Sequence, residues 1–170
     1  MTGVQTCALP ISYEVDENGK AIILDEEEIE SRFPNAYTWL VETKKEHKKK
    51  DKGSTNDKHW YRYARKQGVD NVEVLKLSSM EICSKHPNVS LNYDNLYHNT
   101  KVYSWVKKKE VKESYEYFLA VANSSLLWWF LKNTGDTLQG DARTLKTNYL
   151  NPFPLPKEVS KETDNFFKKK

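Results

Sequence analysis

A pair of apolar helical segments, separated by a helix-breaking junction, constrains the fold more than any other feature of the sequence. Residues 117–122 (YFLAVA) and 126–131 (LLWWFL) are apolar almost all round, a pattern typical of buried helices. Asn123-Ser124 lies between them, and predicts a stop for the first helix and an N-cap for the second. Lys132 and Gly135 are suited to close the second helix. We therefore expect both helices to be largely buried.

The remaining core material is predicted to form a sheet. Segments 72–77, 89–93 and 96–106 are rich in β-branched and aromatic residues, with a turn at Asp94-Asn95, and 143–149 is a further candidate strand. We predict an α+β fold in which a mixed, twisted sheet packs on the apolar helices. The apolar stretch at 115–131 is interrupted and falls short of the roughly 20 residues that a membrane-spanning helix needs. No membrane span is expected.

Local signals predict the elements at the start of the chain. Asn18-Gly19 is a two-residue turn of the hairpin type, followed by a short strand at 21–24. Asp25 stands three residues before Glu28, the spacing of a capping box, and Pro34 suits the first turn of another helix. One face of that helix is expected to dock on a core through Phe33, Tyr37, Leu40 and Val41.

The ends of the chain differ from its body. Residues 1–11 (MTGVQTCALPI) lack the charge and the apolar run of a secretory signal and resemble a translated sequencing adapter. We expect them to be foreign, with the natural protein continuing upstream of Ser12. The 170 residues suit one domain of ordinary size, expected at 12–156 and followed by a polar tail at 157–170. Cys7 and Cys83 are far apart, which favours a reducing, cytoplasmic setting.

Charge is unevenly distributed along the sequence. The formal net charge of +3 combines −6 over residues 13–32 with +9 over residues 33–170. The run at 44–52 alone carries +4 and passes into the flexible stretch 53–57. Such a basic body suits a polyanionic partner such as nucleic acid, whereas lysines that are merely solvated are the alternative explanation.

The segment 59–68 (HWYRYARKQG) interleaves aromatic rings with cations. Rings of this kind stack on bases while the cations neutralise phosphates. The alternative places Trp60 and Tyr63 in the core with the cations simply exposed. Both interpretations remain open from the sequence.

Several motifs resemble catalytic or metal sites without matching them. The order Asn151-Pro152-Phe153-Pro154 differs from the N-P-P-aromatic motif of amino-group DNA methyltransferases, and no Gly-rich cofactor turn precedes it. Cys83 and His86 lack a second ligand pair for zinc. The spacing from Glu73 to Lys76 does not fit a metal-dependent nuclease. We therefore assign no catalytic residue, no metal and no cofactor to this chain.

Four landmarks occur together in a recognisable order. From residue 28 to 156 the chain resembles the C-terminal specificity, or target recognition, domain of TaqI-like type II restriction-modification enzymes and their adenine-specific DNA methyltransferases. The middle, 72–106, departs from the Pro-Lys-Ile strand usual in that family, where the target sequence is expected to vary. The landmarks are FPNAY at 33–37, WYRYAR at 60–65, the stretch LAVANSSLLWWFLKNTG at 119–135, and NYLNPFPLP at 148–156.

The resemblance implies a module that recognises duplex DNA beside a separate N-terminal methyltransferase domain. That domain would bind S-adenosylmethionine, and whether the parent protein also cleaves DNA stays open. Trp60, Tyr61 and Tyr63 would support the element that presents cations to DNA, and 135–141 would form a loop at a second DNA-facing edge. The cations expected at DNA are Arg62, Arg65 and Lys66, then Lys48, Lys49 and Lys50 on the backbone, and Arg143 with Lys146 at the second edge.

Two functions of other kinds compete with duplex recognition. A protein-interaction module would dock its apolar helices on a missing domain and use its lysines only for solubility. A single-stranded nucleic-acid binder would use the high aromatic content for stacking. Salt-dependent binding to duplex DNA separates recognition from the first alternative, and competition by single strands separates it from the second.

Overall fold

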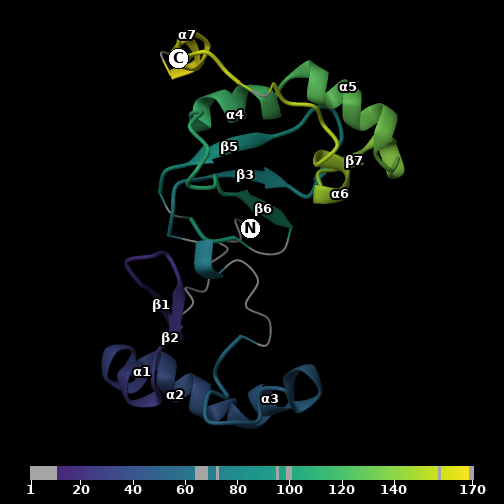
Figure 1. Ribbon diagram of the computed structural model, residues 1–170. Coiled ribbons are helices and arrows are strands. Elements are labelled where there is room, and N and C mark those ends of the chain that lie inside the picture. Colours follow the sequence, from purple (N-terminus) through teal and green to yellow (C-terminus); the bar gives the residue numbers. More distant parts are fainter. Residues whose placement is uncertain are drawn as a thin grey trace, which may run out of the picture. The chain divides into compact units, whose positions relative to one another are not determined.

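The computed structural model describes residues 11–63, 69–71, 73–94, 96–98, 101–156 and 158–168. Contacts within the chain group it into two compact units, Met1–Glu73 and Val74–Lys170, and each is described by itself. Helices and small sheets occur together, which confirms the predicted α+β class (Figure 1). In the described part of the chain, no helix is long and apolar enough to cross a membrane.

Unit 1 opens with the predicted hairpin. Its strands β1 (Tyr13–Val15) and β2 (Ala21–Ile23) pair antiparallel, with Tyr13 opposite Ile23. The Asp16 carboxylate accepts hydrogen bonds from the backbone nitrogens of Asn18 and Lys20, at 2.9 and 2.8 Å. Gly19 has a φ of 78°, a conformation that glycine adopts without steric cost. The hairpin is confirmed, but its turn is longer than the two residues predicted: the Asp16 nitrogen donates to the Lys20 carbonyl at 2.9 Å, so residues 17–19 lie between the paired ends.

Three helices follow in unit 1. They are α1 (Glu26–Arg32), α2 (Pro34–Glu42) and α3 (Lys44–Lys49). The 3-10 turn η1 (Lys50–Gly53) continues α3, and a second 3-10 turn, η2 (Val69–Asn71), comes later in the chain. The capping box of Asp25 and Glu28 is present and Pro34 begins α2, so both predictions are confirmed. The core contains Leu24, Ile29, Leu40, Trp60 and Tyr61.

The predicted docking face of α2 is wrong at one position. Leu40 is buried and Phe33 and Tyr37 pack against the same core, but Val41 is 43% exposed. Successive helical residues are turned by about 100°, so the residue after Leu40 leaves the buried stripe.

Unit 2 is built on a three-stranded antiparallel sheet with β3 in the centre. The order is β5 (Val89–Asn92), β3 (Lys76–Met80) and β6 (Val102–Trp105). The strand expected at 89–93 is essentially confirmed, whereas β3 begins later than the predicted 72–77 and β6 is shorter than 96–106. The Asn92 side chain binds both backbone groups of Leu96 and keeps that segment out of the strand ladder.

A second strand pair lies beyond this sheet. Strand β4 (Ile82–Cys83) pairs antiparallel with β7 (Arg143–Thr144). The strand predicted at 143–149 ends at Thr144, because α6 (Thr147–Leu150) begins three residues later. The short turn η3 (Gln139–Asp141) precedes β7.

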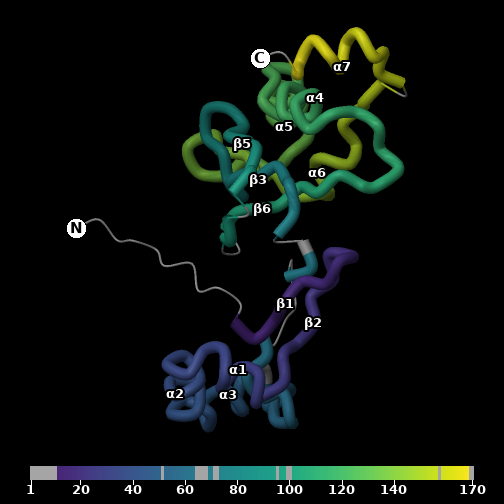
Figure 2. The backbone as a smooth tube through the Cα atoms, turned by 90° about the vertical axis from the view of Figure 1, so that its left-hand side faces the viewer, coloured from purple at the N-terminus to yellow at the C-terminus, as the bar shows by residue number. Residues whose placement is uncertain are grey.

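Two helices pack with one face of the sheet, α4 (Tyr115–Ala122) and α5 (Ser125–Thr134) (Figures 1 and 2). The core between helices and sheet contains Leu77, Val89, Leu127, Leu131 and Leu145. The predicted junction is confirmed, since the Ser124 hydroxyl accepts a hydrogen bond from the backbone nitrogen of Leu127 at 3.1 Å. At Gly135 a Cβ atom would lie only 2.9 Å from the Leu131 carbonyl oxygen, so a larger residue does not fit this helix end.

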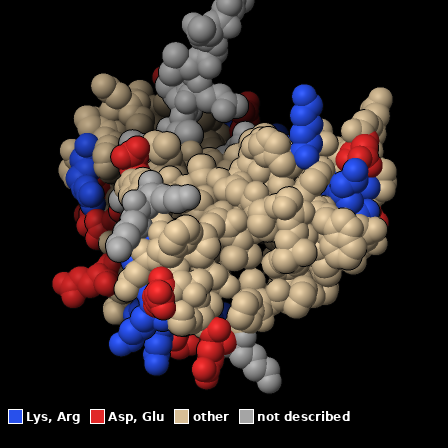
Figure 3. Space-filling view, turned by 90° about the horizontal axis from the view of Figure 1, so that it is seen from above, with Lys and Arg blue, Asp and Glu red and all other residues tan. Residues whose placement is uncertain are grey.

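The expectation that both apolar helices are largely buried is wrong for the outer side of α5. Leu126 is 61% exposed and Trp129 is 63% exposed, whereas Leu127 and Leu131 are buried. The core of unit 2, to which Leu127 and Leu131 belong, covers a single side of α5, so the apolar residues on the opposite side of this helix face solvent. Figure 3 looks onto unit 2 from the helix side, where uncharged residues fill the middle of the view and charged ones stand mainly at its margin.

The segment described from sequence as a polar tail contains a docked helix, α7 (Lys161–Lys168). Phe167 makes an edge-on ring contact with Tyr117 of α4 at 5.9 Å. The Asp164 carboxylate accepts hydrogen bonds from the backbone nitrogen and the hydroxyl of Ser114, at 2.7 and 2.6 Å. Ser114 is the N-cap of α4, so α7 is attached to the start of that helix.

Candidate nucleic-acid interface

The aromatic residues of the WYRYAR landmark have separate positions in unit 1. Trp60 and Tyr61 are buried, with exposures of 2% and 5%. The Trp60 indole donates to the Glu26 carboxylate at 3.3 Å and the Tyr61 hydroxyl donates to the Leu24 carbonyl at 2.8 Å. Burial, aided by nearby carboxylates, raises the pKa of Tyr61 to about 12. Tyr63 is 41% exposed and stacks on Tyr13 with ring centroids 5.7 Å apart.

Arg62 is engaged within its own unit. Its Nη1 donates to both carboxylate oxygens of Asp57 at 2.6 Å, and its Nη2 donates to the Ser54 carbonyl at 2.6 Å. The guanidinium also holds the pKa of the Asp57 carboxyl below its usual range. Arg62 therefore braces the 53–57 loop, and it would have to leave these partners to meet a base. Arg65 and Lys66 lie outside the described residues.

Four lysines of the run at 44–52, namely Lys45, Lys48, Lys49 and Lys52, form a basic surface that we term the lysine corner. Lys45, Lys49 and Lys52 are exposed and Lys48 is half-buried, all on α3 and η1. Among the side chains that the structure describes, which do not include that of Asp51, none of these four lysines has an ion-pair partner.

A buried anchor holds the lysine corner in place. His47, 8% exposed, lies edge-on to the rings of Trp39 and Trp60, with centroid distances of 5.9 and 6.1 Å. The hydroxyl of fully buried Thr55 donates to the His47 carbonyl at 2.6 Å. Lys52 and Gly53 have positive φ values of 60° and 85°, which turn the chain back toward Thr55. The lysines thus extend from an ordered support.

Two other lysines of the run, Lys44 and Lys50, contact the residues that anchor the lysine corner. The Lys44 ammonium pairs with Glu26 at 3.4 Å and lies 4.4 Å from the centre of the Trp60 ring. Lys50 donates to Nδ1 of His47 at 2.6 Å. Burial, with a smaller contribution from the Lys50 charge, lowers the pKa of His47. Of the three lysines predicted to grip the backbone, Lys48 and Lys49 belong to the lysine corner and Lys50 also contacts the imidazole.

The second DNA-facing edge predicted from the sequence lies in unit 2. Of its two cations, Arg143 is buried and Lys146 is exposed. Only 5% of the Arg143 side chain is exposed, and it pairs with the Asp141 carboxylate at 3.0 Å. Its Nη1 also donates to the Asp141 and Ala142 carbonyls at 2.9 and 3.0 Å. Lys146 is exposed beside the start of α6. Arg143 therefore supports the 136–143 loop, and Lys146 is the accessible charge.

Sequence reasoning missed the partners that immobilise the predicted cations. Asp57 is five residues before Arg62 and Thr55 is eight residues after His47. The short sequence separation of Asp57 and Arg62 could have indicated the ion pair. The hydrogen bond from Thr55 to the His47 carbonyl gave no such signal, because it depends on how the chain between them folds back. Sequence reasoning also missed the polar face of the sheet, where serines recur at Ser78 and Ser90.

Neither metal ligation nor similarity to known proteins adds to this site. In the described ranges, no group of three His, Cys, Asp or Glu side chains could hold a metal ion. Cys83 is buried and carries a free thiol, whose pKa is raised by burial. Comparison with protein-family models and with curated proteins finds no match. The functional argument therefore rests on the charge, exposure and anchoring of the lysine corner.

Proposed function

We propose that the chain recognises duplex DNA as the specificity domain of a restriction-modification adenine methyltransferase, with the lysine corner holding the phosphate backbone. The observation that carries the proposal is the combination of four outward lysines with a buried His47–Thr55 anchor beneath them. A solvated helix end needs no such anchor. An ordered support lowers the conformational entropy that the lysines lose when they meet phosphates.

The dimensions of the lysine corner suit a DNA backbone. At about 1.5 Å per residue, the six residues of α3 rise about 9 Å. Each strand of duplex DNA carries one negative charge per about 3.4 Å of the axis, so about three phosphates of one backbone occur over that length. Flexible lysines act as point charges, and such contacts provide affinity without reading sequence.

Sequence choice is assigned to the part of the chain that follows Trp60. In the family that the sequence resembles, this landmark would present cations to DNA, and Arg65 and Lys66 are the members of it that follow Arg62, outside the described residues. A planar guanidinium can pair with a guanine edge, so Arg65 is the proposed reader. Trp60 and Tyr61, which open this landmark, are buried in unit 1.

The parent activity is part of the same proposal. Methyl transfer from S-adenosylmethionine would take place on a separate N-terminal domain, which would be the protein partner of this chain. A cytoplasmic setting agrees with the free thiol of Cys83. No residue of this chain is assigned to the chemical step.

One observation favours the alternative of a protein-interaction module. Leu126 and Trp129 are three residues apart on α5, so they share one exposed apolar side of the helix. A module that functions only through this side would bind DNA no better than its overall charge allows. Substitution of the lysine corner would then have no special effect.

The proposal is tested by binding of the full chain to a labelled 20-base-pair duplex between 50 and 200 mM salt. Replacing Lys45, Lys48 and Lys49 with Ala is expected to weaken binding to all sequences alike. It should flatten the slope of log affinity against log salt by about 0.9 for each lost phosphate contact, up to about 2.7. The matched control replaces Lys20, Lys85 and Lys161 with Ala. These three lysines are exposed, and their replacement removes the same charge.

Each outcome has a defined meaning. A larger effect of the lysine-corner variant than of the control supports the proposal. Equal effects would refute a dedicated backbone contact and favour the protein-interaction alternative. Full competition by single-stranded DNA of the same length would instead favour a single-strand binder.

A further inference from the structure

Strand β6 forms one edge of the sheet of unit 2, and its pairing with β3 uses only every second residue. The Glu81 nitrogen donates to the Lys101 carbonyl at 2.8 Å, and these two residues continue the register in which Met80 lies opposite Val102. Hydrogen-bonded and non-hydrogen-bonded pairs alternate along two antiparallel strands. The residues of β6 whose backbone bonds to β3 are therefore Tyr103 and Trp105.

The backbone N–H and C=O groups of Val102 and Ser104 point away from β3, toward the open edge. Among the residues that the structure describes, no partner is found for these four groups, whereas the Ser104 hydroxyl is bonded to the His98 ring. Val102 and Ser104 are both half-buried, so part of each is accessible. An edge with unpaired backbone donors and acceptors is a template on which another strand can pair.

The opposite edge of the same sheet is occupied by a side chain of the chain itself. Asn123, which follows α4, accepts a hydrogen bond from the Val89 nitrogen at 3.0 Å and donates to the Val89 carbonyl at 2.8 Å. Val89 belongs to β5, so the carboxamide bonds to this edge as a neighbouring strand would. No equivalent side chain is found at β6 within the described part of unit 2.

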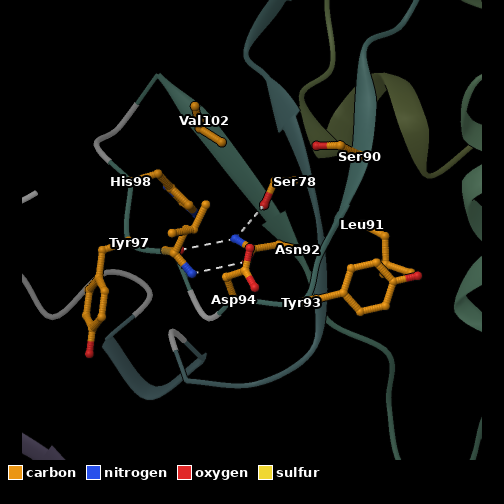
Figure 4. Close-up of a pocket in the computed structure, with 10 residues that line it drawn as sticks. Ser78, Ser90, Leu91, Asn92, Tyr93, Asp94, Tyr97, His98 and Val102 are labelled. Atoms are coloured by element: carbon orange, nitrogen blue, oxygen red, sulfur yellow. Dashed lines mark hydrogen bonds between the residues drawn. The ribbon is translucent and has the colours of Figure 1, made fainter. Parts of the chain in front are cut away.

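The face of the sheet opposite the helices offers side chains that are already engaged. A pocket opens there, but Asn92 in its wall accepts a hydrogen bond from the Leu96 nitrogen at 3.0 Å and donates to the Leu96 carbonyl at 3.2 Å. Figure 4 shows the Asn92 carboxamide between Ser78 and the segment that carries His98. The backbone groups along the edge of β6 are therefore better placed to bond a partner than the side chains of this face.

Charge at the end of β6 indicates what kind of strand fits the edge. Lys108 and Lys109 follow the strand and are exposed, and among the described side chains neither has an ion-pair partner. A second copy paired antiparallel would bring these lysines toward Lys101 of the other copy, and a parallel copy would bring the two lysine runs together. Like charges that face each other across strands are destabilising, and lysines beside an edge oppose self-pairing. A strand that carries carboxylates at this end would be attracted instead.

We propose that β6 binds an extended acidic peptide segment as an added antiparallel strand. Main-chain hydrogen bonds to Val102 and Ser104 would provide affinity, as in other complexes formed by strand addition. The acidic residues would lie at the N-terminal end of the peptide, because that end of an antiparallel strand meets Lys108 and Lys109. The inference goes beyond the proposed function, because it concerns a peptide partner of unit 2 and needs no DNA.

A capped synthetic peptide of sequence EETVTVT tests the inference on the isotope-labelled full chain. Hydrogen exchange at the Val102 and Ser104 amides is expected to slow about tenfold, with a saturable dependence on peptide concentration. The Tyr103 and Trp105 amides are already bonded to β3 and should change little. The control peptide KKTVTVT keeps the alternation of Val and Thr but reverses the charge, and should bind about tenfold more weakly.

Two substitutions of Ser104 separate its backbone from its side chain. Ser104→Pro removes the outward N–H, and proline is tolerated in an edge strand where the missing N–H would face solvent, so peptide binding should weaken about tenfold while the fold is kept. Ser104→Ala removes only the hydroxyl and should bind the peptide as the unmodified chain does. Replacing Lys108 and Lys109 with Glu leaves β6 intact and should reverse the preference between the two peptides, which tests the inference even if Ser104→Pro does not fold.

Each remaining outcome would overturn the inference. These outcomes are absence of saturable protection at Val102 and Ser104, and equal binding of the two peptides. Protection that grows with chain concentration in the absence of peptide would indicate pairing with a second copy, and protection by a 20-base-pair duplex would indicate a nucleic-acid contact. The lysine-corner variant is altered only in unit 1 and should bind the peptide unchanged, so failure of the DNA proposal and failure of this inference give different results.

Discussion

Asn123 is predicted to hold the end of α4 to the edge of the sheet. Its Oδ1 accepts a hydrogen bond from the Val89 backbone nitrogen at 3.0 Å, and its Nδ2 donates to the Val89 carbonyl at 2.8 Å. Val89 belongs to the edge strand β5, so the carboxamide takes the place of a neighbouring strand. Asn123→Ala removes both bonds to Val89, and with them a longer bond of 3.2 Å from Nδ2 to the exposed Leu119 carbonyl within the helix, without adding bulk.

The expected loss follows from the two bonds. Each contributes about 1 kcal/mol net, so unit 2 should lose about 2 kcal/mol of its free energy of unfolding. The loss would be larger if the backbone of buried Val89 stayed inaccessible to water. A change of about 1.4 kcal/mol is tenfold in an equilibrium constant, so the open state should become about 30-fold more populated.

Native-state hydrogen exchange of the full chain measures this effect at the amides of β3 and β5. Protection there is expected to fall about 30-fold in Asn123→Ala. The control is Asn133→Ala, which removes a single bond at 2.7 Å from an exposed side chain to the Trp129 carbonyl. It should change protection by less than about threefold, in keeping with a surface substitution. Equal protection in the two variants would refute the role assigned to Asn123.

Two further predictions concern pH. Folding lowers the pKa of His47, so the unfolded state binds more protons than the folded state. Unit 1 should therefore lose stability as the pH falls below the ordinary histidine pKa of about 6.5. Urea titrations followed at the Trp39 and Trp60 indole signals should show this loss of stability, and His47→Gln should remove it. The bonds from Lys168 and Ser114 hold the pKa of Asp164 at about 2, so attachment of α7 should be complete above pH 4 and weaken as the pH falls toward 2. Exchange of the α7 amides should show that weakening at pH 2, whereas Asp164→Ala should weaken attachment already at neutral pH and exposed Glu162→Ala should not.

Local chemistry made part of the fold predictable. The turn at Asn18-Gly19, the Asp25–Glu28 box, Pro34 at the start of α2 and the Ser124 cap each involve residues within a few positions of one another. Such signals need no knowledge of the tertiary structure. They located the hairpin and the beginnings of three helices, α1, α2 and α5.

The features that the sequence did not predict depend on contacts between segments that are far apart in the chain. The start of β3 depends on its pairing with β5 and β6, and the solvent-facing side of α5 depends on which side of the helix the core covers. The engagement of Arg143 likewise depends on carbonyl groups beside it and on the Lys132 carbonyl at the end of α5, at 3.4 Å. A sequence pattern identifies a cation but does not show whether its charge is already used.

The sequence therefore predicted which residue types the candidate interface contains better than it predicted their positions and contacts. The lysine run at 44–52 is exposed in large part, as the charge pattern suggested. Arg62, in contrast, is bound to Asp57 and Ser54. The assignment of DNA contacts to particular residues stays a prediction.

The salt dependence of duplex binding by the unmodified chain tests the central claim most directly. Four phosphate contacts from the lysine corner predict that log affinity falls with log salt with a slope of about −3.6, and further contacts would make it steeper. The account predicts this slope for unrelated duplex sequences as well, because lysines read charge rather than bases. A slope near zero between 50 and 200 mM salt would contradict it.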